Sequence, residues 1–120
     1  MRNLKKFIER APKTDLHVHL DGSLRPQTLI EIARKEGIEL PSYTVEGLYE
    51  TLFKERYSDL GDCLKAFAYT VKAMQTPEDL ERIAYEFALD NQAEGVRYVE
   101  VRFAPQLHVN STMDMERVLS

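Results

Sequence analysis

The chain has 120 residues, enough for one small domain with a hydrophobic core. Sixteen basic and 20 acidic residues give a formal net charge of −4, which argues against binding nucleic acid or membrane surfaces through charge. The single cysteine, Cys63, excludes an internal disulfide, and no apolar run reaches membrane-spanning length. We therefore expect a soluble cytoplasmic protein without nucleic-acid or membrane partners.

The first third of the chain is predicted to contain a helix, a strand and a second helix, in that order. The segment RNLKKFIERA, residues 2–11, has apolar residues at helical spacing and is followed by Pro12. A strand is predicted from about residue 13 to residue 20, and a turn follows in DGSLRP. Pro26 then suits the first turn of a helix, and Gly37 is its predicted end.

The middle of the chain is predicted to be mainly helical. Thr44 is a candidate N-cap for a short helix, and residues 57–74 repeat apolar side chains on one helical face. Thr76 precedes a proline and two acidic residues, which is a strong helix-start signal. Gly95 is the predicted end of that helix, and the segment 111–120 has the pattern of a further helix start.

A second strand is predicted in VRYVEVRFAP, residues 96–105. Both strands alternate in sequence between aliphatic and polar residues, which predicts one aliphatic and one polar face for each strand. The aliphatic positions are Leu16, Val18, Leu20, Val99, Val101 and Phe103, and the polar ones are Asp15, His17, His19, Asp21, Tyr98, Glu100 and Arg102.

A strand, several helices and a second strand imply a parallel pair joined by a right-handed crossover. We therefore predict an α/β fold, mostly helical, that corresponds to the N-terminal part of a (β/α)₈ barrel. In such barrels, reactive groups gather at the carboxyl ends of the strands. His17, His19 and Asp21 stand at that end of the first strand.

The segment DLHVHLDGS has the residue types of a metal site. Residues two apart on a strand have Cα atoms roughly 6.6 Å apart on one face, so His17 and His19 can converge on one ion. Nitrogen ligands suit zinc, iron, nickel or copper better than magnesium or calcium. A catalytic zinc also needs a third protein ligand and an open position for water. Histidines at this spacing also occur without any metal, so the pattern leaves both interpretations open.

The other candidates have simpler interpretations. His108 is expected to be a loop or packing residue, and Cys63 a small apolar residue on its helix. Glu100 and Arg102 fit a structural ion pair in a polar interior.

Two blocks resemble the adenosine deaminase family within the amidohydrolase superfamily. PKTDLHVHLDGSLRPQTL is similar to the family's N-terminal signature, and VRYVEVRFAPQLH is similar to its second barrel strand. The blocks occur in the family's order, and the resemblance covers essentially the whole chain. It implies a zinc-dependent hydrolase that converts adenosine and 2′-deoxyadenosine to inosine and 2′-deoxyinosine with release of ammonia.

The resemblance also implies residue roles. His17 and His19 match the first two ligands of one zinc ion per subunit, and His19 also lies against the substrate. Asp21 matches the acid that binds the ribose 5′-hydroxyl group. The stripe Leu60, Leu64 and Phe67 is similar to an apolar lid helix over the nucleoside, although it fits core packing equally well.

The family's catalytic glutamate and histidine, and its remaining zinc ligands, belong to later strands and have no match in this sequence. Residues 1–120 are therefore expected to be the N-terminal portion of a single, incomplete barrel domain. Such a fragment is expected to be inactive alone, and to self-associate or pair with the missing barrel part.

Two other functions stay open. One is an adenine deaminase, or another purine deaminase of the same superfamily. Relatives that act on free adenine tend to carry EGTLEP where this chain has DGSLRP, which favours the nucleoside. The other is a catalytically inactive metal-binding or structural fragment.

Overall fold

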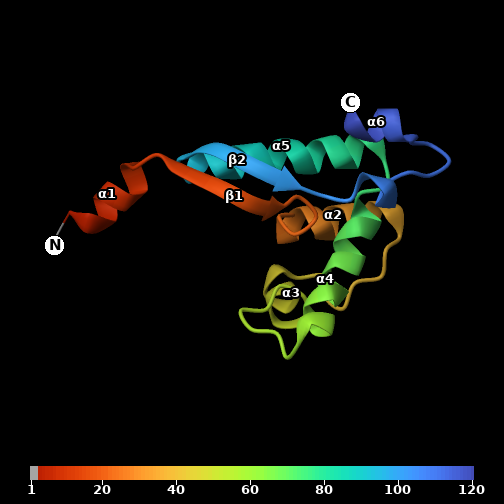
Figure 1. The fold of residues 1–120 in the computed structure, drawn as a ribbon. Coiled ribbons are helices and arrows are strands. Elements are labelled where there is room, and N and C mark those ends of the chain that lie inside the picture. Colours follow the sequence, from red (N-terminus) through yellow and green to blue (C-terminus); the bar gives the residue numbers. More distant parts are fainter. Residues whose placement is uncertain (1–2) are drawn as a thin grey trace.

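The computed structural model describes residues 3–120 (Figure 1), so Met1 and Arg2, where the first predicted helix begins, lie outside the description. The elements within this range follow the predicted order. They are α1 (Leu4–Arg10), β1 (Lys13–His19), α2 (Pro26–Glu36), α3 (Val45–Thr51), α4 (Leu60–Ala73), α5 (Pro77–Ala93), β2 (Val96–Arg102), the 3₁₀-helix η1 (Pro105–Leu107) and α6 (Met115–Leu119).

Local signals set most of the helix boundaries. The side chains of Thr44, Asp59, Thr76 and Asp114 each accept a hydrogen bond from the backbone N–H three residues later, at the start of α3, α4, α5 and α6 respectively. Gly37 ends α2 with φ of 69°, a left-handed conformation that favours glycine. The predicted caps at Thr44 and Thr76 and the predicted stop at Gly37 are therefore confirmed.

β1 and β2 form a parallel pair, as predicted. The register pairs Asp15 with Val99 and Val18 with Val101, so β1 has one more residue than β2 in that interval. This bulge changes which side chains share a face. Asp15 lies beside Val18 in a hollow against α5, and Leu16 is 59% exposed. The prediction of strict alternation along β1 is therefore wrong at its centre.

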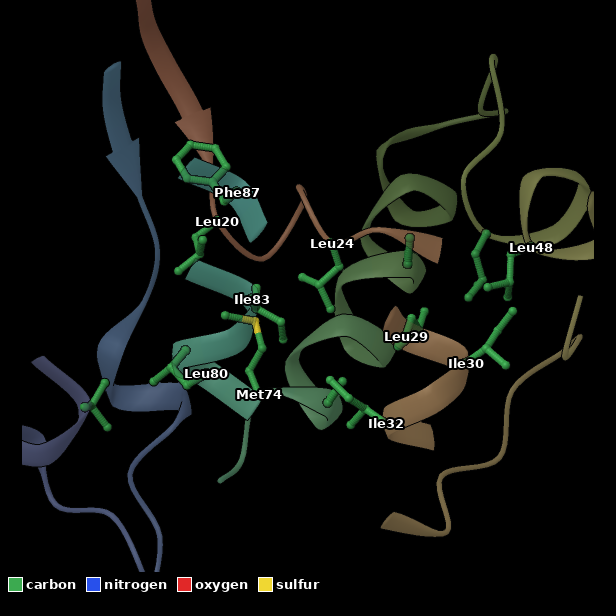
Figure 2. Packing of buried hydrophobic residues seen from close by; sticks show 14 of the residues in the cluster. Leu20, Leu24, Leu29, Ile30, Ile32, Leu48, Met74, Leu80, Ile83 and Phe87 are labelled. Carbon is green, nitrogen blue, oxygen red and sulfur yellow. The ribbon is translucent and has the colours of Figure 1, made fainter. Parts of the chain in front are cut away.

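The core lies between the helices and under the carboxyl ends of the strands. Figure 2 shows Leu29 and Ile32 of α2 on one side of α4, with Met74 and the α5 residue Ile83 on the other. Leu20 and Leu24, from the turn after β1, join the same cluster, so the turn is anchored in the core. These leucines are 6% and 7% exposed and stand at the two ends of the turn, so the core fixes the turn that carries the site residues.

α1 stands apart from this core and extends away from the rest of the chain (Figure 1). Its apolar residues Leu4, Phe7 and Ile8 are each more than half exposed. Among residues 3–120, no helix is long and apolar enough to cross a membrane.

Candidate active site

The site is built at the carboxyl end of β1. His17 and His19 are among the last three residues of β1. Directly after them, the backbone N–H of Leu20 donates to the carbonyl oxygen of Arg102 at 2.8 Å. The chain then turns sharply, because the N–H of Gly22 and the hydroxyl of Ser23 both donate to the carbonyl oxygen of His19, at 3.2 and 2.6 Å. This turn brings Asp21 to the side of the histidines.

The two histidine rings lie close together. Their centroids are 5.2 Å apart with an interplanar angle of 62°. Two imidazoles that share one tetrahedral zinc, with Zn–N bonds of about 2.0–2.1 Å, have ring centres roughly 5 Å apart. The side chains of both are accessible, and no hydrogen bond within residues 3–120 occupies a ring nitrogen of either. The pair therefore fits two positions of a zinc site.

The described residues do not supply the rest of such a site. Within residues 3–120, no group of three or more histidine, cysteine or carboxylate side chains could hold a metal ion. The carboxylate of Asp21 is close to the pair, but its Oδ1 atom lies 3.8 Å from Nδ1 of His19, beyond hydrogen-bond distance. A third ligand would have to come from outside this range.

Asp21 is buried, with 7% of its surface exposed. Its Oδ1 atom is fully buried and has no hydrogen-bond partner among residues 3–120. Its Oδ2 atom also has no partner there, but is not among the buried atoms. A buried carboxylate oxygen without a partner is costly, so Asp21 is a candidate for a functional role rather than a packing role.

An apolar hollow of about 510 Å³ opens beside His19 and Asp21. Its other walls come from α4 and from the segment after β2. The lining residues are Leu64, Phe67, Ala68, Val71, Arg102, Phe103, Ala104 and Leu107. An apolar cavity with a few polar groups at one end is the usual form of a small-molecule site.

Phe67 is the contact between α4 and the turn. Its ring meets that of His19 edge to face, with centroids 6.0 Å apart. A Cβ atom placed on Gly22 would lie 3.3 Å from the Phe67 ring, so glycine permits this close approach. α4 is thereby held against the turn of the site.

The three predicted lid residues differ in their position relative to the hollow. Leu64 and Phe67 line the hollow, whereas Leu60 does not and is 73% exposed. Sequence reasoning did not single out Phe103 and Leu107 as lining residues. Their position directly after the second strand, where barrel loops carry function, is the signal that could have indicated them.

His108 lies behind the wall of the hollow and is fully buried. Its ring stacks on Phe103, with centroids 5.9 Å apart, and its Nδ1 atom is 3.0 Å from the carbonyl oxygen of Met74. Burial lowers its pKa, opposed by the Met74 carbonyl and by the negative charge of Asp21. The prediction of a packing residue agrees with this position.

The predicted ion pair between Glu100 and Arg102 is not formed among residues 3–120. Glu100 instead accepts a hydrogen bond from the Tyr98 hydroxyl at 2.9 Å.

A parallel α/β unit with histidines and an aspartate at the carboxyl end of its first strand is the arrangement of an enzyme of the (β/α)₈-barrel class. The sequence profile described as adenosine deaminase matches residues 12–120. The chain belongs to the adenosine deaminase family.

Individual relatives agree with this assignment. An adenosine deaminase of Clostridium perfringens is 47% identical over 109 residues, which are 90% of this chain and 33% of the relative. An adenine deaminase from Arthrobacter aurescens superposes with a TM-score of 0.70 at 31% identity, over 81% of this chain and 29% of that one. The arabidopsis protein ADAL in complex with IMP gives a TM-score of 0.66 at 26% identity, over 95% of this chain and 33% of that one.

The chain thus spans about a third of the length of the relatives that it matches. Within that third, the predicted fold class is confirmed: an α/β fold with two parallel strands and intervening helices, as in the first part of a (β/α)₈ barrel.

Proposed function

We propose that residues 1–120 are the N-terminal portion of a single barrel domain that hydrolyses adenosine and 2′-deoxyadenosine to inosine and 2′-deoxyinosine with release of ammonia. The observation that carries the proposal is that His19 and Asp21 line an apolar hollow large enough for a purine, with the ring of His17 beside that of His19. Family membership and 47% identity to an adenosine deaminase support it. The proposed compartment is the cytoplasm.

His17 and His19 would hold one zinc ion together with ligands from outside this chain. The bound metal would supply Lewis-acid chemistry that makes water reactive near neutral pH. His19 has a second role, because its ring also borders the hollow and would lie against the substrate. Phe67 packs on that ring and limits its orientation.

The nucleoside would occupy the hollow with its sugar toward Asp21. The accessible Oδ2 atom of Asp21 would accept a hydrogen bond from the ribose 5′-hydroxyl group, which free adenine lacks. The apolar side chains of Leu64 and Phe67 would cover the base and exclude water, which strengthens polar interactions inside the site.

The experiment requires the complete enzyme, in which this chain is joined to the rest of a barrel. The barrel can be its own continuation or the part of the Clostridium perfringens relative that this chain does not match. We expect the purified enzyme to deaminate adenosine much faster than adenine and to contain about one zinc per subunit. His17→Ala is expected to lower both the zinc content and the activity. Unchanged zinc content in this variant would contradict the assignment of the ligand.

The 120-residue chain alone is expected to be inactive. It contains two of the at least three protein ligands that a catalytic zinc needs, and no residue that matches the family's acid/base. Its unpaired strand edges favour self-association or pairing with the missing barrel part. Assays with adenosine and added zinc, combined with sedimentation analysis, test this expectation. Robust deamination by a monomer would show that residues 1–120 are a complete enzyme.

A further inference from the structure

Two buried polar atoms without partners lie at the hollow, one on a residue that lines it and one on a residue behind its wall. One is Oδ1 of Asp21 and the other is Nε2 of His108, and neither has a hydrogen-bond partner among residues 3–120. Both side chains are more than nine-tenths buried. Phe103, on which the His108 ring stacks, lines the hollow together with Asp21. Buried polar atoms are nearly always satisfied, so each of these two atoms requires an explanation.

The protonation state of His108 follows from its surroundings. The carbonyl oxygen of Met74 can only accept, so the Nδ1 atom at 3.0 Å from it carries a proton and donates. Burial lowers the pKa of His108, which favours the neutral ring at neutral pH. In a neutral ring with a protonated Nδ1, the Nε2 atom is an acceptor. The carboxylate oxygen Oδ1 of Asp21 is also an acceptor.

Two acceptors cannot bond to each other, but a water molecule can donate one hydrogen to each of them. We infer that His108 is a positioning residue, and that it holds the carboxylate of Asp21 through a buried water between Nε2 and Oδ1. Buried waters typically bridge polar groups that would otherwise be unsatisfied. Phe103 connects the two groups, because it stacks on the His108 ring and lines the hollow together with Asp21.

The bridge has a consequence for substrate selection, which rests on the function proposed above. With Oδ1 fixed from behind, the carboxylate is held in one rotamer and Oδ2 faces the accessible side. A fixed acceptor selects for a substrate hydroxyl at that point, whereas a freely rotating carboxylate would bind water as readily. His108 would thus determine the preference for a 5′-hydroxyl group without contacting the substrate.

The test compares adenosine with 5′-deoxyadenosine in the complete enzyme. His108→Asn keeps a donor near the Met74 carbonyl but removes the acceptor at Nε2. We expect KM for adenosine to rise about tenfold, with kcat nearly unchanged and 5′-deoxyadenosine turnover unaffected. His108→Gln places an amide near the Nε2 position and should restore part of the preference. Equal losses on both substrates, or an unchanged preference, would overturn the inference.

A second measurement needs no substitution at His108. The ¹⁵N chemical shift of Nε2 should be that of an unprotonated nitrogen that accepts a hydrogen bond, and it should move in Asp21→Asn. A protonated Nε2, or a shift that is insensitive to this substitution, would refute the bridge. If the unaltered enzyme shows no preference for adenosine over 5′-deoxyadenosine, the proposed role of Asp21 fails, and the ¹⁵N shift still decides whether His108 is linked to it.

Discussion

Leu64→Ala tests whether α4 covers the substrate, because α4 offers a matched control on the same face. Leu64 lines the hollow and is 52% exposed, whereas Leu60 lies one turn earlier, is 73% exposed and does not line it. Both leucines are truncated by the same three carbon atoms. A difference between the two variants therefore reports on the position of the side chain rather than on the helix.

The expected magnitude follows from the exposed fraction of Leu64. Full burial of a leucine side chain is worth about 1.5–3 kcal/mol, and about half of the Leu64 surface is still exposed. Covering that half with a purine would contribute about 1 kcal/mol, which corresponds to roughly fivefold in KM. Leu60→Ala is expected to change KM by less than about twofold, because Leu60 has no contact with the hollow.

Steady-state kinetics with adenosine on the complete enzyme measure both variants, and thermal unfolding checks that each retains its fold. Since both leucines are largely exposed, neither substitution should have the effect of a buried cavity. If KM stays at the wild-type value in both variants, the argument that the hollow beside His19 holds the substrate is refuted. An equally large increase for both would show that the helix as a whole, and not its contact with the hollow, determines KM.

Three further outcomes are expected. Asp21→Ala in the complete enzyme should lower adenosine turnover far more than residual adenine turnover; equal losses would assign Asp21 a structural role. In the 120-residue chain, the free energy of unfolding should fall as pH drops from about 6.5 toward the lower folded-state pKa of His108, because the unfolded chain then binds a proton that the folded chain excludes. His108→Asn should make the free energy of unfolding, measured in denaturant titrations, less dependent on pH; an unchanged pH dependence would contradict this role of His108. Gly37→Ala should cost about 1–2 kcal/mol of unfolding free energy, since φ is 69° there; a neutral effect would contradict this.

The helix boundaries could be predicted from the sequence because their signals are local. Thr76 accepts a hydrogen bond from an N–H three residues away, and Gly37 ends its helix through its own backbone conformation. Such features need no knowledge of the rest of the chain. The closeness of the His17 and His19 rings at the end of β1 could also be predicted, because a strand places alternate residues on one face.

Features that depend on distant parts of the chain could not be predicted. The bulge in β1 arises from the register with β2, more than 80 residues later, and it moves Asp15 to the side of Val18. The contact of Phe67 with His19 depends on the path of α4 over the turn. The bond from His108 to the Met74 carbonyl spans 34 residues, so no local pattern distinguishes this histidine from an ordinary loop residue.

The distribution of polar and apolar surface suggests that metal binding and barrel closure depend on each other. The two histidines would supply only part of the proposed metal site. A second hollow of about 650 Å³ beside β2, α5 and α6 leaves apolar residues such as Val101 and Leu119 partly uncovered. Closure by further strands would cover these residues and supply the remaining ligands at once. Zinc should therefore stabilise the complete protein by about 2.7 kcal/mol at a hundredfold excess over Kd, and the 120-residue chain far less. Thermal unfolding of both, with zinc and after chelation, measures the difference, and equal stabilisation of the two would show that residues 1–120 already hold the metal by themselves.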